Sequence, residues 1–151
     1  MTSPEITLEA LGERMAQATP QAAALGLRLV SVQPGDAVMA LPHNPALIGD
    51  PETGVLAPGA VTTLLDHVCG LAVSSKVMGG GAIGSIATLD LRIDYMRAAI
   101  PGREIIARAD CYHVTHSIAF VRAAAFDDHD EADPVATAQA AFALAARGGD
   151  Q

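Results

Sequence analysis

The residue of this chain best placed to do chemistry is Asp66, in the middle of the apolar stretch LAPGAVTTLLDHVCGLAVSSK at residues 56–76. A carboxylate among apolar side chains is costly unless it is paired or hydrogen-bonded. Held in place, such a group can act as a general base or as a nucleophile. The alternative is a structural role, in which Asp66 bonds to Thr62, Thr63 or a neighbouring strand.

Gly59, near the start of the same stretch, is a second candidate. A helix N-terminus presents free N–H groups and a partial positive charge, which suit a developing oxyanion. Pro58 has no N–H, so the predicted donor is the amide of Gly59, with Ala60 as its helper. Gly59 and Asp66 lie roughly 10 Å apart along one helix, whereas a base must come within about 3 Å of its proton. We therefore expect antiparallel helices of two subunits to share each site, in a homodimer or a dimer of dimers.

The stretch that carries these residues is predicted to be a long helix enclosed on most sides. Its apolar residues recur at helical spacing, and its other side is small rather than charged. Before it, residues 6–17 have the spacing of a short amphipathic helix. Residues 26–42 read as a hairpin that turns at Pro34-Gly35, and residues 43–54 as a polar loop.

The remainder of the chain has the pattern of strands. In residues 86–97, Leu89, Leu91, Ile93 and Tyr95 alternate with polar residues, which predicts a half-buried strand with Thr88 on the opposite face. Residues 103–114 and 117–127 read as two more strands. Residues 135–146 are rich in alanine, which favours helix, but their place after three strands favours a fourth. We predict a strand there, and an α+β fold overall.

The composition limits the classes of partner. The net charge is −8, with 17 acidic and 9 basic residues, which argues against binding nucleic acid or an anionic membrane. Two cysteines are too few for a disulfide scaffold, and their spacing does not suggest zinc. Neither a signal peptide nor an apolar run of about 18 residues is recognisable. We expect a cytoplasmic protein with one domain over residues 1–151, of which residues 1–22 are an N-terminal helical extension.

From about Gly26 onward, the chain resembles hotdog-fold acyl-CoA thioesterases of the phenylacetate-degradation type. The resemblance depends on Asp66 in the central helix, on Thr88 in the strand ATLDLRIDYMR, and on the Tyr95-Met96-Arg97 segment that ends this strand. The chain departs from the family at the helix entrance, where Ala57-Pro58-Gly59 replaces His-Gly-Gly. It departs again where Thr115-His116 replaces the Gly-Arg of many relatives.

The resemblance implies a hotdog fold, in which an antiparallel sheet wraps a long central helix. It also implies metal-independent hydrolysis of an acyl- or aryl-CoA thioester, with coenzyme A as part of the substrate and no cofactor. Asp66 would be the base or nucleophile and Gly59 the oxyanion donor. Thr88 would hold the attacking water or Asp66, unless it is simply a β-branched strand residue. Ala60, Gly70 and Gly79 suggest room for an acyl group.

The phosphates of coenzyme A need cations, and the candidates are Arg97 and His116, with Arg92, Arg103 and Lys76 as further possibilities. Each of these arginines can instead balance the acidic surface. His67 and Cys69 are predicted to be structural, because an apolar helix usually holds an inert thiol. Two other functions stay open: a non-catalytic acyl-CoA-binding hotdog protein, favoured by Ala57-Pro58, and a dehydratase, disfavoured because Ala57 removes the expected histidine.

Overall fold

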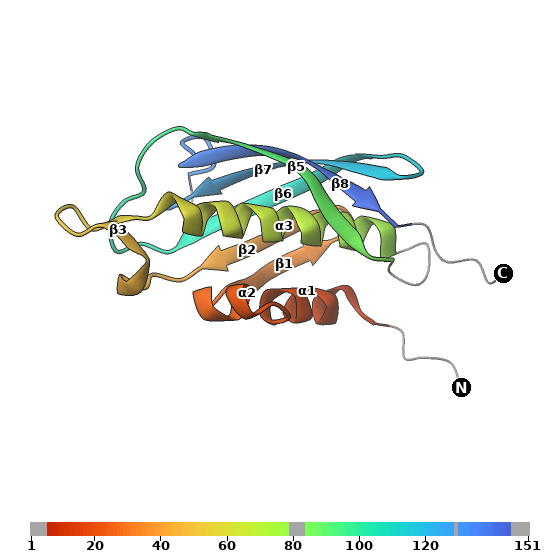
Figure 1. The fold of residues 1–151 in the computed structure, drawn as a ribbon, viewed down its shortest axis with the longest axis horizontal. Helices are drawn as coiled ribbons and strands as arrows, with labels where there is room; N and C mark the ends of the chain where they lie inside the picture. Colours follow the sequence, from red (N-terminus) through yellow and green to blue (C-terminus); the bar gives the residue numbers. More distant parts are fainter. Residues whose placement is uncertain (1–5, 79–83, 129, 146–151) are drawn as a thin grey trace.

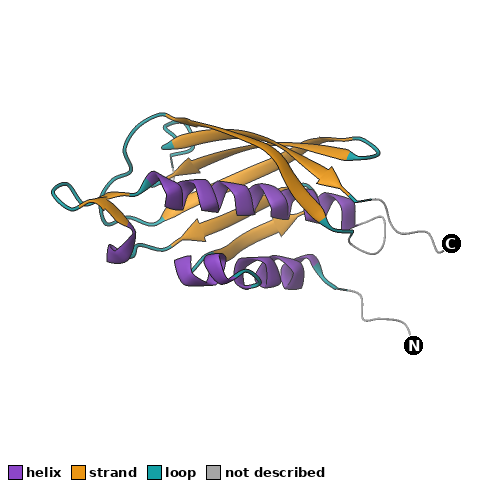
Figure 2. Cartoon of the chain, viewed as in Figure 1, coloured by secondary structure: helices purple, strands orange, loops and turns teal. Residues whose placement is uncertain are grey.

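A computed structural model describes residues 6–78, 84–128 and 130–145 of the chain. One long helix lies across one face of a six-stranded antiparallel sheet, as Figures 1 and 2 show. The helices and strands, in chain order, are α1 (Leu8–Gln17), α2 (Pro20–Leu25), β1 (Arg28–Gln33), β2 (Asp36–Leu41), β3 (Ile48–Asp50), β4 (Val55–Leu56), α3 (Pro58–Met78), β5 (Ile86–Tyr95), β6 (Ile105–Val114), β7 (Ile118–Phe126) and β8 (Ala136–Leu144). The predicted α+β class and the hotdog arrangement are confirmed.

The strands of the large sheet follow the order β1-β2-β6-β7-β8-β5. The alanine-rich segment is strand β8, as its place in the chain predicted, because it pairs with β7 on one side and with β5 on the other. Two ladders outweigh the helical preference of alanine, which is a weak local term. The β1–β2 hairpin turns at Pro34-Gly35 as predicted, and the φ of Gly35 is +80°, as the third position of a type II turn requires.

The buried side of α3 forms the centre of the core. Five of its fully or almost fully buried residues recur at helical spacing: Val61, Leu64, Leu65, Val68 and Leu71. They pack against alanines of the inner sheet face, which have almost no exposed surface on β6, β7 and β8. Small residues on the sheet allow the backbone of a helix to approach closely. A core with few aromatic residues is therefore filled by aliphatic side chains from the helix.

The N-terminal segment forms two helices where the sequence predicted one. Thr7 caps α1, and its hydroxyl accepts from the Ala10 amide at 3.1 Å. The second helix, α2, has Thr19 as its cap and Pro20 in its first turn, and it ends at Gly26 with φ +69°. These are the usual start and stop signals of a helix. Helix α1 lies along β1 and contacts α3, and α2 also contacts α3 (Figure 1).

The polar loop predicted before α3 contains more structure than expected. A short 3₁₀ helix at Pro45–Leu47 leads into the small β3–β4 ladder. The loop returns to the start of α3, where the amide of Ala57 donates to the carbonyl of Leu47 at 2.8 Å. This contact fixes the direction in which the chain enters the helix.

Candidate active site

Asp66 lies half-buried on α3 and is held from the sheet rather than from its own helix. The hydroxyl of Thr88 on β5 donates to its Oδ1 at 2.9 Å. The two helix threonines considered as partners bond elsewhere: Thr62 to the carbonyl of Pro58, and Thr63 to that of Gly59. Among the residues that the structure describes, Oδ2 of Asp66 accepts no hydrogen bond. One carboxylate oxygen is thus oriented, and the other is free to act on a ligand.

Thr88 faces the helix because β5 contains a β-bulge. The pairing with β8 shifts register between Thr88 and Asp90, so Leu89 has no partner there. Thr88 pairs with Phe142 and Leu91 with Ala140. Phe142 and Ala140 are two positions apart on β8 and lie on one face of the sheet, so Thr88 and Leu91 also share a face. The prediction that Leu89 is on the apolar face, with Thr88 on the opposite one, is therefore wrong. The side chain of Leu89 is exposed (59%), and Thr88 comes to the helix side.

The helix entrance offers a free amide at Gly59. The N–H of Ala60 donates to the carbonyl of Ala57 at 3.1 Å, and Pro58 has no N–H. Within the described part of the chain, the N–H of Gly59 has no acceptor, and a Cβ at Gly59 would have no atom within 4 Å. Seven residues turn a helix by almost two full turns, so Gly59 and Asp66 are on the same face of α3. An amide donor and a carboxylate thus share one face, too far apart to act together within one chain.

A contact that the sequence did not predict holds the first turn of α3. The hydroxyl of Tyr95, at the end of β5, donates to the carbonyl of Pro58 at 3.0 Å and also contacts the Thr62 hydroxyl. The carbonyl of Pro58 is therefore bonded from the strand as well as from within the helix. This arrangement fixes the turn that carries the Gly59 amide. Tyr95 belongs to the strand pattern, but its spacing alone does not indicate a bond from the end of β5 to the first turn of the preceding helix.

Two further residues on α3 have structural surroundings, as predicted. The ring of His67 bonds through Nδ1 to the carbonyl of Thr63 at 3.0 Å, and through Nε2 to the hydroxyl of Thr19 at 3.2 Å. It therefore joins the N-terminal helices to α3. Cys69 is fully buried, and burial, followed by the nearby Asp66 charge, raises the pKa of its thiol to about 12. Such a thiol is not a nucleophile at neutral pH.

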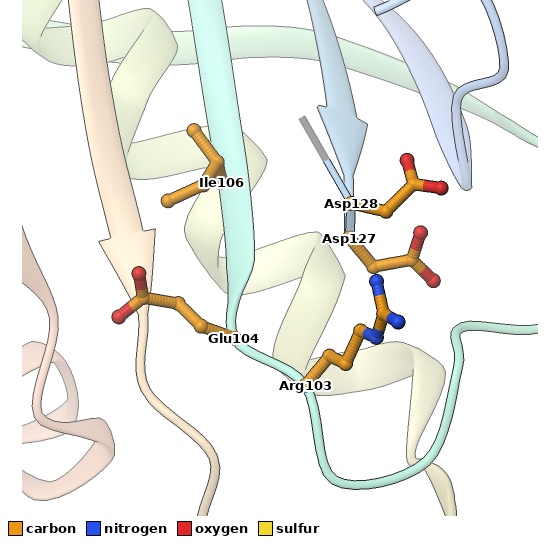
Figure 3. A pocket seen from close by; sticks show the side chains of 5 residues that line it. All are labelled: Arg103, Glu104, Ile106, Asp127 and Asp128. Carbon is orange, nitrogen blue, oxygen red and sulfur yellow. The ribbon is translucent and has the colours of Figure 1, made fainter. Parts of the chain in front are cut away.

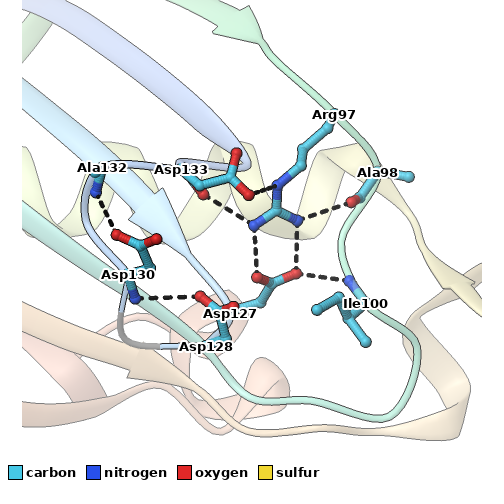
Figure 4. A network of polar contacts seen from close by, with 8 residues as sticks. All are labelled: Arg97, Ala98, Ile100, Asp127, Asp128, Asp130, Ala132 and Asp133. Carbon is cyan, nitrogen blue, oxygen red and sulfur yellow. Dashed lines mark hydrogen bonds and ion pairs between the residues drawn. The ribbon is translucent and has the colours of Figure 1, made fainter.

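Arg97, predicted to be a phosphate ligand, is engaged in an ion-pair network (Figure 4). Its two terminal nitrogens bond the Asp127 carboxylate at 3.0 and 2.7 Å. They also donate to the carbonyls of Ala98 and Asp133, and Nε lies 3.2 Å from the Asp133 carboxylate. The four N–H groups of the two terminal nitrogens therefore all have protein acceptors, whereas Nε is buried and makes no hydrogen bond to the described residues. In this arrangement no terminal N–H of Arg97 is free for a phosphate.

The partner of Arg97 is fully buried. The side chain of Asp127 has no exposed surface, and it also accepts from the amide of Ile100 at 2.6 Å. The hydrogen bond from Arg97 holds the pKa of the Asp127 carboxyl below its ordinary value, and the same bond raises the pKa of Arg97. The network joins the segment after β5 to the segment after β7. It stabilises the end of the sheet and takes no part in the Asp66 site.

Two other basic candidates, Arg103 and His116, have surroundings of their own. Arg103 lines a pocket with Glu104, Ile106, Asp127 and Asp128 (Figure 3). Three carboxylates in its wall make this pocket unfavourable for a phosphate. His116 is exposed in the turn between β6 and β7. Gly79, proposed to give room to an acyl group, lies outside the described residues. The structure thus brings together Asp66 and Thr88, and the contacts of Arg97 and His116 with coenzyme A stay predictions.

The described residues contain no group of three or more His, Cys, Asp or Glu residues placed to bind a metal ion. None of the helices in this part of the chain has both the length and the apolar character needed to span a membrane.

The family model of the thioesterase superfamily matches residues 53–133, which include α3, Asp66 and Thr88. A crystal structure of a Pseudomonas aeruginosa protein is similar over 92% of this chain and 100% of that one, with 35% identity and a TM-score of 0.81. No match was found among curated proteins.

Two more distant solved structures are similar to this chain, and at their low identity the similarity shows only a common fold. A mutant of the phenylacetic acid degradation protein PaaI from Thermus thermophilus has 24% identity and a TM-score of 0.71, over 84% of this chain and 100% of that one. A Haemophilus influenzae thioesterase has 17% identity and a TM-score of 0.75, over 92% and 90%. From the family match and the Pseudomonas relative together, the chain belongs to the thioesterase superfamily.

Proposed function

We propose that the protein is an acyl-CoA thioesterase, which hydrolyses an acyl- or aryl-CoA thioester to the free acid and coenzyme A. The observation that carries this proposal is the Asp66–Thr88 pair, in which one carboxylate oxygen is held at 2.9 Å and the other is without a partner among the described residues. Superfamily membership supplies the class of reaction. The proposed chemistry uses a carboxylate and an amide and needs no metal ion.

In the proposed reaction, Oδ2 of Asp66 either takes a proton from water or attacks the thioester carbonyl itself. In the first case the water oxygen forms the new bond to the carbonyl carbon. The carbonyl oxygen becomes negative and accepts a hydrogen bond from the Gly59 N–H of a second subunit. The carbon–sulfur bond then breaks, and the sulfur leaves as the coenzyme A thiolate, which takes up a proton. If Asp66 attacks, water hydrolyses the resulting anhydride and regenerates the carboxylate.

The test of this proposal is a panel of acyl- and aryl-CoA thioesters, with release of the free thiol as the measured quantity. We expect turnover of at least one thioester by the wild type. Asp66→Asn, which has nearly the same shape and cannot accept a proton, is expected to lower kcat by roughly 10²-fold or more. An unchanged rate in a folded Asp66→Asn variant would show that the role of Asp66 is structural.

The shared site can be tested by mixing two inactive variants. If Gly59 of one subunit serves Asp66 of the other, a dimer of one Gly59→Val and one Asp66→Asn chain contains one intact site. Refolding the two variants together in equal amounts should then restore about a quarter of the wild-type activity, by the symmetry of a two-fold dimer. Light scattering should give the mass of a dimer or a tetramer. No recovery on mixing, with each variant folded, would contradict a shared site.

A second candidate function is non-catalytic acyl-CoA binding. The observation in its favour is the helix entrance, where Pro58 removes one N–H and the bond to Ala57 occupies the N–H of Ala60. Fewer available donors stabilise an oxyanion less. Tight binding of acyl-CoA without thiol release from any chain length or aryl group would establish this function. The predicted contact of His116 with coenzyme A phosphates stays a prediction under either function.

A further inference from the structure

The peptide unit between Pro58 and Gly59 is bonded at its carbonyl and open at its N–H. The carbonyl oxygen accepts from the hydroxyl of Tyr95 at 3.0 Å and from the hydroxyl of Thr62 at 3.2 Å. The N–H, which belongs to Gly59, has no acceptor within the described part of the chain. Gly59 itself is exposed, and a Cβ built on it would meet nothing within 4 Å. A ligand can therefore approach this N–H.

The bonded carbonyl and the open N–H belong to one rigid group. A peptide unit is planar and trans, so its N–H points away from its carbonyl oxygen, and the two turn together. In the first turn of a helix, the N–H groups have no partner within the helix to fix their direction. The Tyr95 hydroxyl can therefore set the direction of the Gly59 N–H from the far end of the same peptide, without touching it.

The two hydroxyl groups form a short chain of hydrogen bonds that ends on the Pro58 carbonyl. The hydroxyls of Tyr95 and Thr62 also contact each other. Each has one proton to donate, so when one of them donates to the other, the second donates to the carbonyl. Bonds in such a chain polarise one another, which strengthens each by roughly 10–30%. Because electron density is drawn toward the carbonyl oxygen, the N–H of the same peptide becomes a better donor.

We propose that Tyr95 is a positioning residue of the oxyanion site: its hydroxyl directs and polarises the Pro58–Gly59 peptide, whose N–H then holds the thioester oxygen. This inference rests on the function proposed above, in which that oxygen is bound at the helix entrance. Tyr95 is 48% exposed, so its ring contributes little to the core, and its hydroxyl makes the polar contact with α3. Strand β5 then supports both halves of the chemistry, because Thr88 of the same strand holds Asp66.

Kinetics of Tyr95→Phe, which removes only the hydroxyl, test the inference. We expect kcat to fall roughly 3- to 10-fold, the range set by one hydrogen bond, with KM and the melting temperature close to those of the wild type. In a Gly59→Val background, where the thioester carbonyl is kept from the N–H, the same change should alter kcat by less than about 2-fold. Tyr112→Phe is the matched control, because Tyr112 is the other of the 2 tyrosines and is similarly exposed, at 50%, on β6. It should leave kcat unchanged.

Isotope-edited infrared spectroscopy tests the same contact without turnover. The probe is a ketone analogue of acyl-CoA with a labelled carbonyl, in which a methylene group replaces the thioester sulfur. Its acyl group is that of the thioester in the panel that reacts fastest or, without any reaction, binds most tightly. A hydrogen bond to the carbonyl lowers its stretching frequency, and this lowering should be smaller in Tyr95→Phe than in the wild type or in Tyr112→Phe.

The possible outcomes separate this inference from the proposed function. A lowered carbonyl frequency that depends on Tyr95, without thiol release from any thioester, would refute the thioesterase and keep the inference. An unchanged kcat or carbonyl frequency in Tyr95→Phe, or an equal loss of kcat with and without Gly59→Val, would overturn the inference and keep the thioesterase. If no thioester of the panel reacts or binds, both are wrong.

Discussion

At the residue scale, the hydroxyl of Thr88 orients one oxygen of Asp66 and leaves the other for a ligand. An isolated aspartate on an apolar helix would have no such partner. The choice of Asp66 follows from the sequence, because a carboxylate among apolar residues needs a partner. The identity of that partner does not follow, since Thr62, Thr63 and Thr88 were equal candidates. The carbonyls within the helix already satisfy the first two hydroxyls, which local spacing alone cannot exclude.

Replacing Thr88 tests this orientation. Thr88→Val keeps the β-branched shape and removes the donor, so kcat is expected to fall by about 10-fold or more, since a hydrogen bond to a charged group contributes about 1.5–3 kcal/mol. Thr88→Ser keeps the hydroxyl and should stay close to the wild type. Steady-state kinetics on the best thioester of the panel makes the comparison. Equal rates for the valine and serine variants would contradict a role for the hydroxyl.

Replacing Gly59 tests the amide donor. A Cβ at this position meets no atom within 4 Å, so Gly59→Ala and Gly59→Val are both expected to fold with an unchanged melting temperature. The valine side chain, however, should keep the thioester carbonyl from the N–H and lower kcat by roughly 10²–10³-fold. Alanine should have a smaller effect. A fully active Gly59→Val variant would show that the oxyanion is not bound at the helix entrance.

At the scale of elements, β5 shows how a regular pattern can predict a strand correctly and its faces incorrectly. The alternation of residues 86–97 indicates a strand, and β5 occupies Ile86–Tyr95. The same alternation counts Leu89 as an inward residue, but a bulge adds one unpaired position and changes which residues face the helix. A bulge leaves no mark on an apolar–polar alternation that looks regular. The pairing with β8 decides its place.

Deleting single residues of β5 tests the bulge. Deletion of Leu89 removes the unpaired position and keeps Thr88 and Leu91 on the helix face, so the variant should fold and keep most of its activity. Deletion of Leu91 removes a paired, partly buried residue and should lower stability more. Urea unfolding and circular dichroism compare the two. Greater stability after deletion of Leu91 than after deletion of Leu89 would show that the bulge is elsewhere.

The N-terminal helices were only half predicted, for a different physical reason. The apolar spacing of α1 is visible in the sequence, whereas α2 has six residues and too short a repeat to detect. Its capping signals were present all the same, with Thr19 before Pro20 and Gly26 after the last turn. Short helices are recognised by their ends rather than by their periodicity.

At the scale of the whole molecule, the Arg97–Asp127 pair predicts how stability depends on pH. The folded state holds the pKa of Asp127 below the ordinary value of about 4. The pair therefore contributes its full stabilisation above about pH 4 and loses it as the pH falls through the lowered pKa. Asp127→Asn should cost about 3 kcal/mol at pH 7, the low end for breaking a buried pair, because 25% of the Arg97 side chain is exposed.

Urea unfolding between pH 7 and pH 3, at one protein concentration, measures this effect. The wild type should lose stability below about pH 4, and Asp127→Asn should lose less over the same range. Asp128→Asn is the matched control, because Asp128 is exposed and lies next in the chain; its effect should stay within about 0.5 kcal/mol. Parallel pH profiles for the wild type and Asp127→Asn would contradict the role of the pair.

The buried cysteines have a consequence for a protein proposed to release a thiol. The chain contains 2 cysteines, and Cys69 and Cys111 are 0% and 2% exposed. Burial also raises the pKa of both thiols. Formation of a mixed disulfide requires a reachable thiolate. Oxidised coenzyme A therefore finds no cysteine thiol to attack in the folded protein, and the product of the proposed reaction can accumulate and oxidise without forming a mixed disulfide with the protein that formed it.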